Sequence, residues 1–249
     1  MTPDYEKLHA EGVVVDESVG YVMVSTTKFT PELEAVVALM TPVSAISSRE
    51  TFHILGITGD VRGQRHLDIA GGCSDHTAEL LARGAEAYSV DPKYGDIEAI
   101  IAQARKHIEG SPAANAATET IALQRFIESA SQDPSHYRTG YATALDFPND
   151  HFDRVSCFRF MLSHMNIQPD MLIAAVAEGI RVLKPGGTFT ICPTERKEPL
   201  NGFAQANELC REMLHVWLDS NPRIRHYGKE FRLNGKTAVT SLEIEKLAR

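Results

Sequence analysis

The sequence predicts an α/β protein with a doubly wound, mostly parallel sheet and a C-terminal antiparallel hairpin. From His66 onward, short apolar segments of strand length alternate with longer segments that have helical spacing. A turn of small residues, Gly71-Gly72-Cys73-Ser74, joins the first strand to the first helix, as is typical of the opening unit of such a sheet. Near the end of the chain, Asn234-Gly235 favours a tight hairpin turn.

The opening unit covers residues 66–91. We predict a strand at HLDIA (66–70), a helix at DHTAELLAR (75–83) that ends at Gly84, and a second strand at AEAYSV (85–90) that stops at Asp91-Pro92. A strand–helix–strand unit of this length favours a parallel, right-handed connection.

A helical insert is predicted at about 95–134, between the second and third strands. Its first helix ends at Gly110, and a second begins at Ser111-Pro112 and stops near Asp133-Pro134. A parallel crossover needs only one helix. The extra helix therefore either covers a site or builds the face of a homodimer.

The alternation resumes after the insert. We predict strands at YRTGYATAL (137–145) and FDRVSCFRF (152–160), a helix near 169–183, the turn KPGG, a strand at TFTIC (188–192), a helix at 204–220 and the closing hairpin. Residues 66–249 thus form one domain. Residues 1–65 are predicted to be a mostly helical N-terminal cap, because Thr30-Pro31 suits a helix start and Ser47-x-x-Glu50 resembles a capping box that precedes a stop at Gly56.

Composition excludes several classes of protein. Hydrophobic residues make up 43% of the chain and charged residues 23%, as in a globular protein with a real core. A formal net charge of −8 without a basic run argues against nucleic acid as the partner. The sequence shows neither an apolar stretch long enough to span a membrane nor the pattern of a secretory leader, so we expect a cytoplasmic protein. The four cysteines lack C-x-x-C spacing and the histidines lack ligand spacing, so no metal is expected.

The small-residue turn and Asp91 suggest a nucleotide cofactor. Small residues allow a ligand to approach the backbone, and an acid twenty residues after Gly71, at the tip of the second strand, can accept hydrogen bonds from both ribose hydroxyls. A Gly-Gly hairpin and a helix-capping aspartate explain the same residues equally well.

Two further segments of the sequence favour a cofactor site over the purely structural explanation of these residues. ALDFPNDHFDRVSC and RVLKPGGTFTI lie in the expected order, and each resembles a conserved segment of class I SAM-dependent methyltransferases, where SAM is S-adenosyl-L-methionine. The chain from about His66 to Arg249 therefore resembles this Rossmann-like family. The resemblance implies SAM as cofactor and a set of binding residues. Asp68, Ala70, Gly71 and Gly72 would line its methionine end, Asp91 would hold the ribose, Pro92 would lie beside the adenine, Tyr141 and Ala142 would flank the adenine amine, and Phe158 would follow strand four.

Two departures from the family pattern affect the cofactor pose. The glycine loop reads D-I-A-G-G-C-S, so Ala70 and Ser74 stand where the family usually has glycines. Tyr141 stands where the family often has a carboxylate for the adenine amine.

The catalytic candidates are His164, Arg159 and Tyr21. His164 follows the predicted fourth strand and titrates near neutral pH, so it could act as a general base, or it could cap the next helix. Arg159 could bind a substrate carboxylate or form a surface salt bridge, and Tyr21 could face the sulfonium or pack in the cap.

The expected function is a SAM-dependent methyltransferase for a small-molecule substrate in specialised metabolism. The alternative is an enzyme that uses the aminocarboxypropyl chain of SAM and releases methylthioadenosine. An NAD-dependent oxidoreductase is disfavoured because G-x-G-x-x-G is absent. A pseudoenzyme that only binds SAM stays open.

Overall fold

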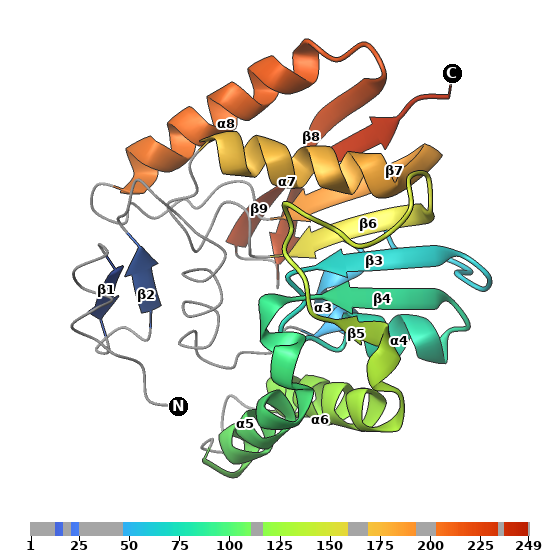
Figure 1. Ribbon diagram of the computed structural model, residues 1–249, viewed down its shortest axis with the longest axis vertical. Coiled ribbons are helices and arrows are strands. Elements are labelled where there is room, and N and C mark those ends of the chain that lie inside the picture. Colours follow the sequence, from blue (N-terminus) through green and yellow to red (C-terminus); the bar gives the residue numbers. More distant parts are fainter. Residues whose placement is uncertain are drawn as a thin grey trace.

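The computed structural model describes residues 13–16, 21–24, 47–110, 117–158, 169–192, 203–233 and 237–248. Its centre is a seven-stranded sheet with the order β5-β4-β3-β6-β7-β9-β8 (Figure 1). The strands are β3 (Arg65–Ile69), β4 (Glu86–Val90), β5 (Tyr137–Arg138), β6 (Phe152–Phe158), β7 (Leu183–Cys192), β8 (Ile224–Leu233) and β9 (Thr237–Lys246). The first five are parallel, and β9 is antiparallel to both β7 and β8. The predicted α/β class, with its C-terminal hairpin, is confirmed.

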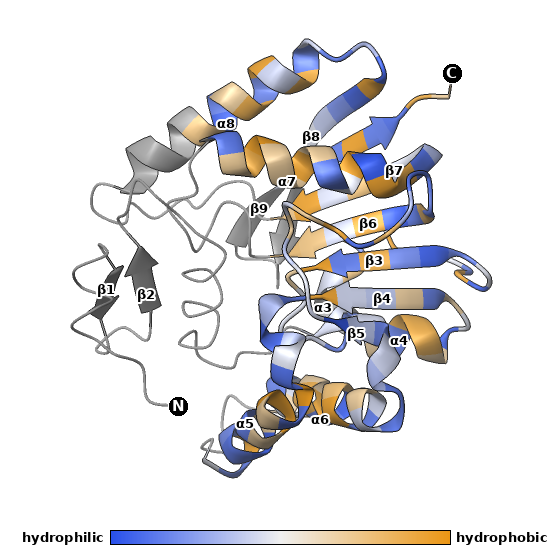
Figure 2. Ribbon diagram, in the orientation of Figure 1, coloured by the Kyte–Doolittle hydropathy of each residue, from blue (hydrophilic) through white to orange (hydrophobic). Residues whose placement is uncertain are grey.

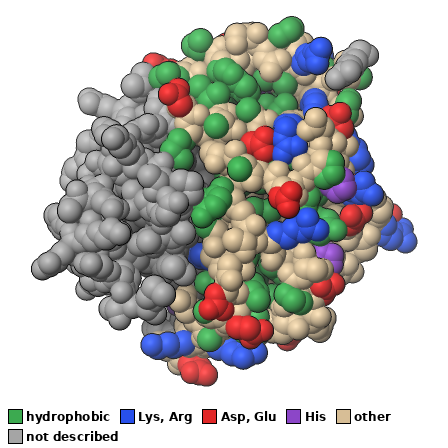
Figure 3. Space-filling model, viewed as in Figure 1, with side chains coloured by type: hydrophobic (Ala, Val, Ile, Leu, Met, Phe, Trp, Pro, Cys, Tyr) green, Lys and Arg blue, Asp and Glu red, His purple; other side chains and the backbone are tan. Residues whose placement is uncertain are grey.

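Helices cover both faces and one edge of the sheet. They are α4 (His76–Ala82), α5 (Ile97–Gly110), α6 (Ala117–Gln132), α7 (Pro169–Val182) and α8 (Phe203–Asp219), with the 3₁₀ helices η1 (Pro92–Asp96) and η2 (Pro134–His136). Helices α5 and α6 lie between β4 and β5 in the chain, and hydrophobic residues concentrate where these two helices meet (Figure 2). On the face seen in Figure 3, hydrophobic side chains gather over α7 and α8.

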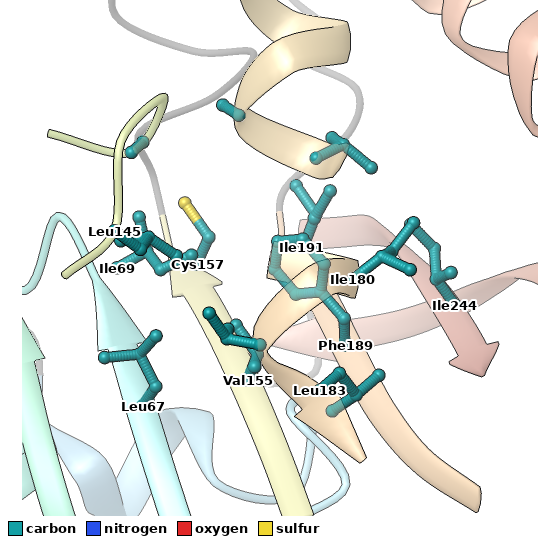
Figure 4. Packing of buried hydrophobic residues seen from close by; sticks show 14 of the residues in the cluster. Leu67, Ile69, Leu145, Val155, Cys157, Ile180, Leu183, Phe189, Ile191 and Ile244 are labelled. Atoms are coloured by element: carbon teal, nitrogen blue, oxygen red, sulfur yellow. The ribbon is translucent and has the colours of Figure 1, made fainter. Parts of the chain in front are cut away.

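The main core lies between the sheet and helices α7 and α8. Alternate residues of a strand point to one face of a sheet, and Figure 4 shows the resulting row of side chains from β3, β6 and β7. Leu67, Val155 and Phe189 belong to this buried cluster. At Gly179 of α7, an added Cβ would lie 2.4 Å from a ring carbon of Phe189. This glycine therefore lets α7 approach the sheet closely.

Strand register aligns the ends of four parallel strands at one edge of the sheet. Ile69 of β3 pairs with Val90 of β4 and with Cys157 of β6, and Val90 pairs with Arg138 of β5. The residues that follow these strands therefore emerge side by side. In doubly wound sheets this carboxyl edge is where ligands bind.

The strand predicted at 137–145 is wrong in extent. Only Tyr137–Arg138 pairs with β4, and an isolated antiparallel bridge joins Tyr141 to Ala144. Beyond Gly140, which lies so close to Val90 that an added Cβ would be 2.9 Å from Cγ1, the chain turns back, and Leu145 is buried in the main core. Burial of apolar residues in an irregular loop produces the same pattern in the sequence as an edge strand.

The described part of residues 1–65 differs from the mostly helical expectation. It contains the antiparallel strands β1 (Val13–Asp16) and β2 (Tyr21–Val24) and the one-turn helix α3 (Ser48–Thr51). The helix predicted from Thr30-Pro31 falls outside the described residues. The domain division at residue 65 stays a prediction.

A buried histidine at the start of β3 predicts acid sensitivity. His66 is buried, and its Nε2 has no hydrogen-bond partner among the described residues. Burial, and then the charge of Arg154, lower the pKa of His66 to about 4, whereas Asp153 opposes this shift. The unfolded chain, with a histidine pKa of about 6.5, binds this proton first as pH falls. Stability from this site is therefore complete above pH 6.5 and is lost progressively between pH 6.5 and 4.

We expect His66→Leu to flatten this part of the stability profile. Urea unfolding at pH 7.5 and pH 5.0 should show that the wild type loses about 2 kcal/mol more than the variant does, by proton linkage. Carboxylates titrate in both proteins, so their contribution cancels in this difference. An equal loss in both proteins would show that His66 accepts a proton as readily in the folded state as in the unfolded one.

Candidate functional site

Asp91 is the centre of the carboxyl edge. It directly follows β4, is only 7% exposed, and caps the 3₁₀ helix η1. Its Oδ1 accepts the backbone N–H of Lys93 at 2.9 Å, and its Oδ2 accepts the backbone N–H of Gly72 at 3.1 Å. One carboxylate therefore joins the end of β4 to the turn that follows β3.

The environment of Asp91 leaves acceptor capacity for a ligand. Burial raises the pKa of Asp91, and the charge of Asp68 adds to this, whereas the Lys93 charge and the two backbone N–H groups lower it. An ionised carboxylate offers about four acceptor positions. With two of them occupied by backbone, the group can still accept two hydroxyl donors.

Gly71 is required by close packing beneath the turn. An added Cβ at this position would lie 2.0 Å from Oγ of Ser89 and 3.0 Å from Oδ2 of Asp68. Tyr94 fixes the next peptide, because its hydroxyl donates to the carbonyl of Gly72 at 2.6 Å and lies 2.9 Å from Oγ of Ser89. Ser89, Asp68 and Tyr94 thus leave no room for a side chain at position 71.

Helix α6 of the insert packs against Tyr94, the residue that holds the turn 71–74 in place. The ring of Tyr94 stacks on Phe126 of α6, with centroids 6.4 Å apart, and meets Tyr137 of β5 edge to face at 5.6 Å. These residues, with Cys73, belong to one buried cluster. Burial raises the pKa of the Tyr94 hydroxyl well above its usual range, so the group stays protonated and remains a donor.

Ala70 adopts a backbone conformation that favours glycine. Its φ is +57°, in the left-handed region, and its N–H donates to the carbonyl of Val90 at 2.7 Å. Gly72 has a φ of +54°, and an added Cβ there would meet no atom of the described residues within 4 Å. Ala70 is therefore strained where the family usually has glycine, whereas Gly72 has no close neighbour among the described residues.

Relief of this strain should stabilise the protein. The left-handed conformation costs an alanine about 1–2 kcal/mol, and the greater unfolded-state freedom of glycine offsets about half of that. We expect Ala70→Gly to raise the free energy of unfolding by about 0.5–1 kcal/mol in urea denaturation.

Ala102→Gly provides a control of opposite sign. Ala102 is exposed within helix α5, where glycine costs about 1 kcal/mol. A loss of stability in both variants would mean that Ala70 is not strained in solution.

Asp68 is the second buried carboxylate of this edge. Its Oδ1 accepts from Oγ of Ser156 at 3.0 Å, and its Oδ2 accepts from Oγ of Ser74 at 3.3 Å. Nδ1 of His76 lies 3.6 Å from the same Oδ2. Ser74 stands where the family pattern has a glycine, and here its hydroxyl binds the loop's own acid.

Asp75 ties two further segments to the turn. This fully buried residue accepts from the backbone N–H of Ser48 at 2.6 Å and from its hydroxyl at 3.1 Å. Its Oδ2 also pairs with Arg125 of α6 at 3.4 Å, and Arg125 reaches Glu79 at 3.1 Å. The residue after the small-residue turn thus connects the α3 segment, α4 and the insert.

The structure brings most of the predicted residues to one edge. Asp68, Ala70, Gly71, Gly72, Asp91 and Pro92 lie at the ends of β3 and β4, Tyr141 and Ala142 lie in the loop after β5, and Phe158 ends β6. Ala142 and Phe158 are buried within core clusters. Arg159 and His164 lie outside the described residues, as does the side chain of Tyr21 in β2.

Sequence reasoning missed five residues of this site: Ser89, Tyr94, Asp75, His76 and Thr51. Their partners lie elsewhere in the chain, so spacing gives no sign of them. Only the position of Asp75-His76, directly after the small-residue turn, could have pointed to these two. Within the described residues, no group of three or more His, Cys, Asp or Glu side chains could hold a metal ion. The helices of the described part include none long and apolar enough to span a membrane.

The residues fit a cofactor with an adenosine and an amino-acid end. The buried Asp91 offers acceptors for ribose hydroxyls, there is no room for a side chain at Gly71, and no described residue lies within 4 Å of a Cβ added at Gly72. The family model for the methyltransferase domain matches residues 67–191, half of the chain. The chain therefore belongs to the methyltransferase domain family, as a class I SAM-dependent methyltransferase, and its cofactor is S-adenosyl-L-methionine.

Solved structures with similar folds are distant in sequence. A protein of Pyrococcus horikoshii is 16% identical with a TM-score of 0.48, over 81% of this chain and 89% of that one. A SAM-dependent methyltransferase of Methanosarcina mazei is 17% identical with a TM-score of 0.47, over 79% and 98%. The 1,6-didemethyltoxoflavin-N1-methyltransferase of Burkholderia thailandensis is 17% identical with a TM-score of 0.46, over 81% and 76%. No curated protein matches the sequence.

Proposed function

We propose that this protein is an enzyme that methylates a small-molecule acceptor of specialised metabolism. The observation that carries the proposal is the hydrogen bond between the Gly72 N–H and the buried Asp91 carboxylate, in a chain that belongs to the methyltransferase domain family. This bond joins the turn after β3 to the end of β4 at the carboxyl edge. When bound, SAM supplies an electrophilic methyl group on a sulfonium sulfur.

The chain's own residues have the following proposed roles. Asp91 accepts hydrogen bonds from the ribose hydroxyls, and Asp68 with the Ala70-Gly71-Gly72 backbone orients the methionine end. Pro92, Tyr141 and Ala142 border the adenine, and Phe158 packs at the end of β6. Where the acceptor must lose a proton, His164 is the candidate base, and Arg159 and Tyr21 are candidates for binding the acceptor.

The contacts of Asp75 with two other segments support a small-molecule acceptor. Ser48 of α3 and Arg125 of the insert both bind Asp75, immediately after the turn. Two segments outside the parallel sheet are thereby held at the site, and the chain carries a net charge of −8. Such additions suit a bordered pocket for a small ligand more than a basic groove for nucleic acid.

Product analysis tests the reaction. Purified protein is incubated with methyl-labelled SAM, first alone and then with a low-molecular-mass cell extract or with a macromolecular fraction. The proposal predicts S-adenosylhomocysteine and labelled small molecules only when the low-mass extract is present. Label in the macromolecular fraction would overturn the acceptor class. Protein-dependent methylthioadenosine from SAM alone would support use of the aminocarboxypropyl chain instead.

Ligand stabilisation tests cofactor choice separately from turnover. A ligand that binds only the folded state raises the melting temperature by mass action. SAM and S-adenosylhomocysteine should raise it, whereas NAD should not. Stabilisation by SAM without product from any fraction would favour a binding-only pseudoenzyme.

A further inference from the structure

The loop after β5 lies beside Asp91. The Asp91 N–H donates to the carbonyl of Arg138, the last residue of β5, at 3.2 Å. Thr139 then lies next to η1, since a Cβ added at Gly95 would be 3.8 Å from its side chain. One bond joins the nucleobase of SAM to its ribose, so a ribose held at Asp91 places the base next to a segment that borders Asp91. Residues 139–149, which we call the β5 loop, are such a segment.

The β5 loop begins with a short turn that is fixed at both ends. Gly140 lies directly against Val90, with 2.9 Å between an added Cβ and Cγ1. At the other end, Leu145 is buried in the main core (Figure 4). Between these two points, the Ala144 N–H donates to the carbonyl of Tyr141 at 3.0 Å. The position of this turn therefore depends on how Gly140 and Leu145 are held.

Two charged residues of α7 hold the second end of the turn. Oε2 of Glu178 accepts the Leu145 N–H at 2.9 Å. The Arg181 guanidinium donates to the carbonyl of Leu145 at 2.7 Å and to that of Phe147 at 2.8 Å. It also donates to Oδ1 of Asn149 at 2.9 Å. Side chains from one turn of α7 thus bind both the N–H and the carbonyl of Leu145.

The arrangement of Glu178 and Arg181 serves the loop as well as the helix. Arg181 donates to both carboxylate oxygens of Glu178, at 2.7 and 2.8 Å. These hydrogen bonds lower the pKa of Glu178, although burial opposes the shift, so the carboxylate is ionised at neutral pH. Of the six hydrogen bonds of the two side chains, two join them to each other and four reach the β5 loop. An ion pair that stabilised only α7 would need none of these four.

We propose that Glu178 and Arg181 are positioning residues for nucleobase recognition, which hold the β5 loop so that its Tyr141–Ala144 turn accepts adenine and rejects a base with a carbonyl in place of the amine. The proposal rests on the proposed roles of Asp91 at the ribose and of Tyr141 and Ala142 beside the adenine. Its consequence is that two residues of α7 determine which base is bound, without contributing to the binding of the ribose or the amino-acid end.

Two ligands that differ only in the base test this proposal. S-inosylhomocysteine has a carbonyl where S-adenosylhomocysteine has the adenine amine. We expect the wild type to bind S-adenosylhomocysteine at least about tenfold more tightly, because a site that hydrogen-bonds a donor rejects an analogue without it. Titration calorimetry gives both dissociation constants, and their ratio is the readout. A general loss of folding or of ribose binding affects both ligands equally and cancels in this ratio.

Substitutions in the pair should reduce the preference for adenine. Arg181→Lys keeps the charge, but a single ammonium cannot hold two carbonyls and an amide oxygen in fixed geometry, so we expect the ratio to fall to about threefold or less. Glu178→Ala, which removes the acceptor of the Leu145 N–H, should have the same effect. An unchanged ratio in both variants would overturn the proposal.

Lys246→Met is the matched control at the same end of α7. Lys246 donates to the carbonyls of Ile180 and Leu183 at 2.8 and 2.6 Å and pairs with Asp150, beyond the β5 loop. Its loss should lower the melting temperature and leave the ratio at the wild-type value. An equal fall of the ratio in this control would show that any weakening of α7 has the same effect, and would also overturn the proposal.

The wild-type protein provides a test that does not depend on variant folding. Amide hydrogen exchange at residues 141–145 should be at least about threefold slower with saturating S-adenosylhomocysteine than with saturating S-inosylhomocysteine, because only adenine stabilises the closed turn. Equal protection by the two ligands would overturn the proposal. Adenine preference without methyl transfer to any small molecule would instead contradict the proposed function, so the two failures are distinguishable.

Discussion

Replacement of Asp91 by alanine is expected to weaken SAM binding on the order of a hundredfold or more. A hydrogen bond to a carboxylate contributes about 1.5–3 kcal/mol, and two ribose hydroxyls would use this group. The buried carboxylate also accepts the Gly72 N–H, so its loss frees the turn that is proposed to border the methionine end. Titration calorimetry with SAM and S-adenosylhomocysteine measures the loss, and thermal unfolding reports the stability of the variant.

A matched control is available five residues further along. Asp96 is an exposed acid at the end of the same 3₁₀ helix, and its Oδ1 accepts the Ala99 N–H at 3.0 Å. Asp96→Ala removes a local capping carboxylate and should leave SAM affinity unchanged. Asp91→Asn should fall between the wild type and Asp91→Ala, because it keeps one oxygen acceptor without the charge. An unchanged dissociation constant in Asp91→Ala would show that Asp91 is only a capping residue.

Substitution of Gly71 by alanine should impair both folding and cofactor binding. Real Cβ atoms essentially never approach a neighbour as closely as the 2.0 Å that would separate this Cβ from Oγ of Ser89. Overpacking of a well-packed region costs about 1–3 kcal/mol. Ser89 is buried and bonded to Tyr94, so movement of its hydroxyl also disturbs the donor to the Gly72 carbonyl. We expect SAM affinity to fall at least tenfold, as measured by calorimetry on folded protein.

A double-mutant cycle distinguishes this clash from other effects. Ser89→Ala removes the clashing oxygen and by itself costs about 1 kcal/mol, for one lost hydrogen bond. Residues in direct contact deviate from additivity, and here the Gly71→Ala/Ser89→Ala protein should be more stable than the sum of the single effects predicts. Additive losses would mean that the alanine methyl group is accommodated elsewhere in the turn.

The elements that the sequence predicted correctly are those that depend on interactions between residues close together in the chain. Helix α5 ends at Gly110 as predicted, and β3, α4 and β4 lie within a residue of the predicted segments. Each depends on side-chain periodicity or on turn chemistry between near neighbours. The strand expected at 137–145 rested on the same local signals, and there the burial of Leu145 in a loop decided the outcome. The described residues of 1–65 include the paired strands β1 and β2, and the N-terminal cap stays a prediction.

The sequence by itself determined the α/β class, the order in which strands, helices and turns follow one another along the chain, and the positions of Gly71, Gly72 and Asp91 in that order. Tertiary structure alone decided that the Gly72 N–H binds Asp91, that Tyr94 supports the turn, and that Ser48 and Arg125 meet at Asp75. Hydrophobic periodicity depends only on neighbours along the chain. It therefore specifies which face of an element is buried, but not which residues pack against that face. The partner of a buried polar group, such as Asp68 for His76, depends on how distant elements pack, and therefore appears only in the folded chain.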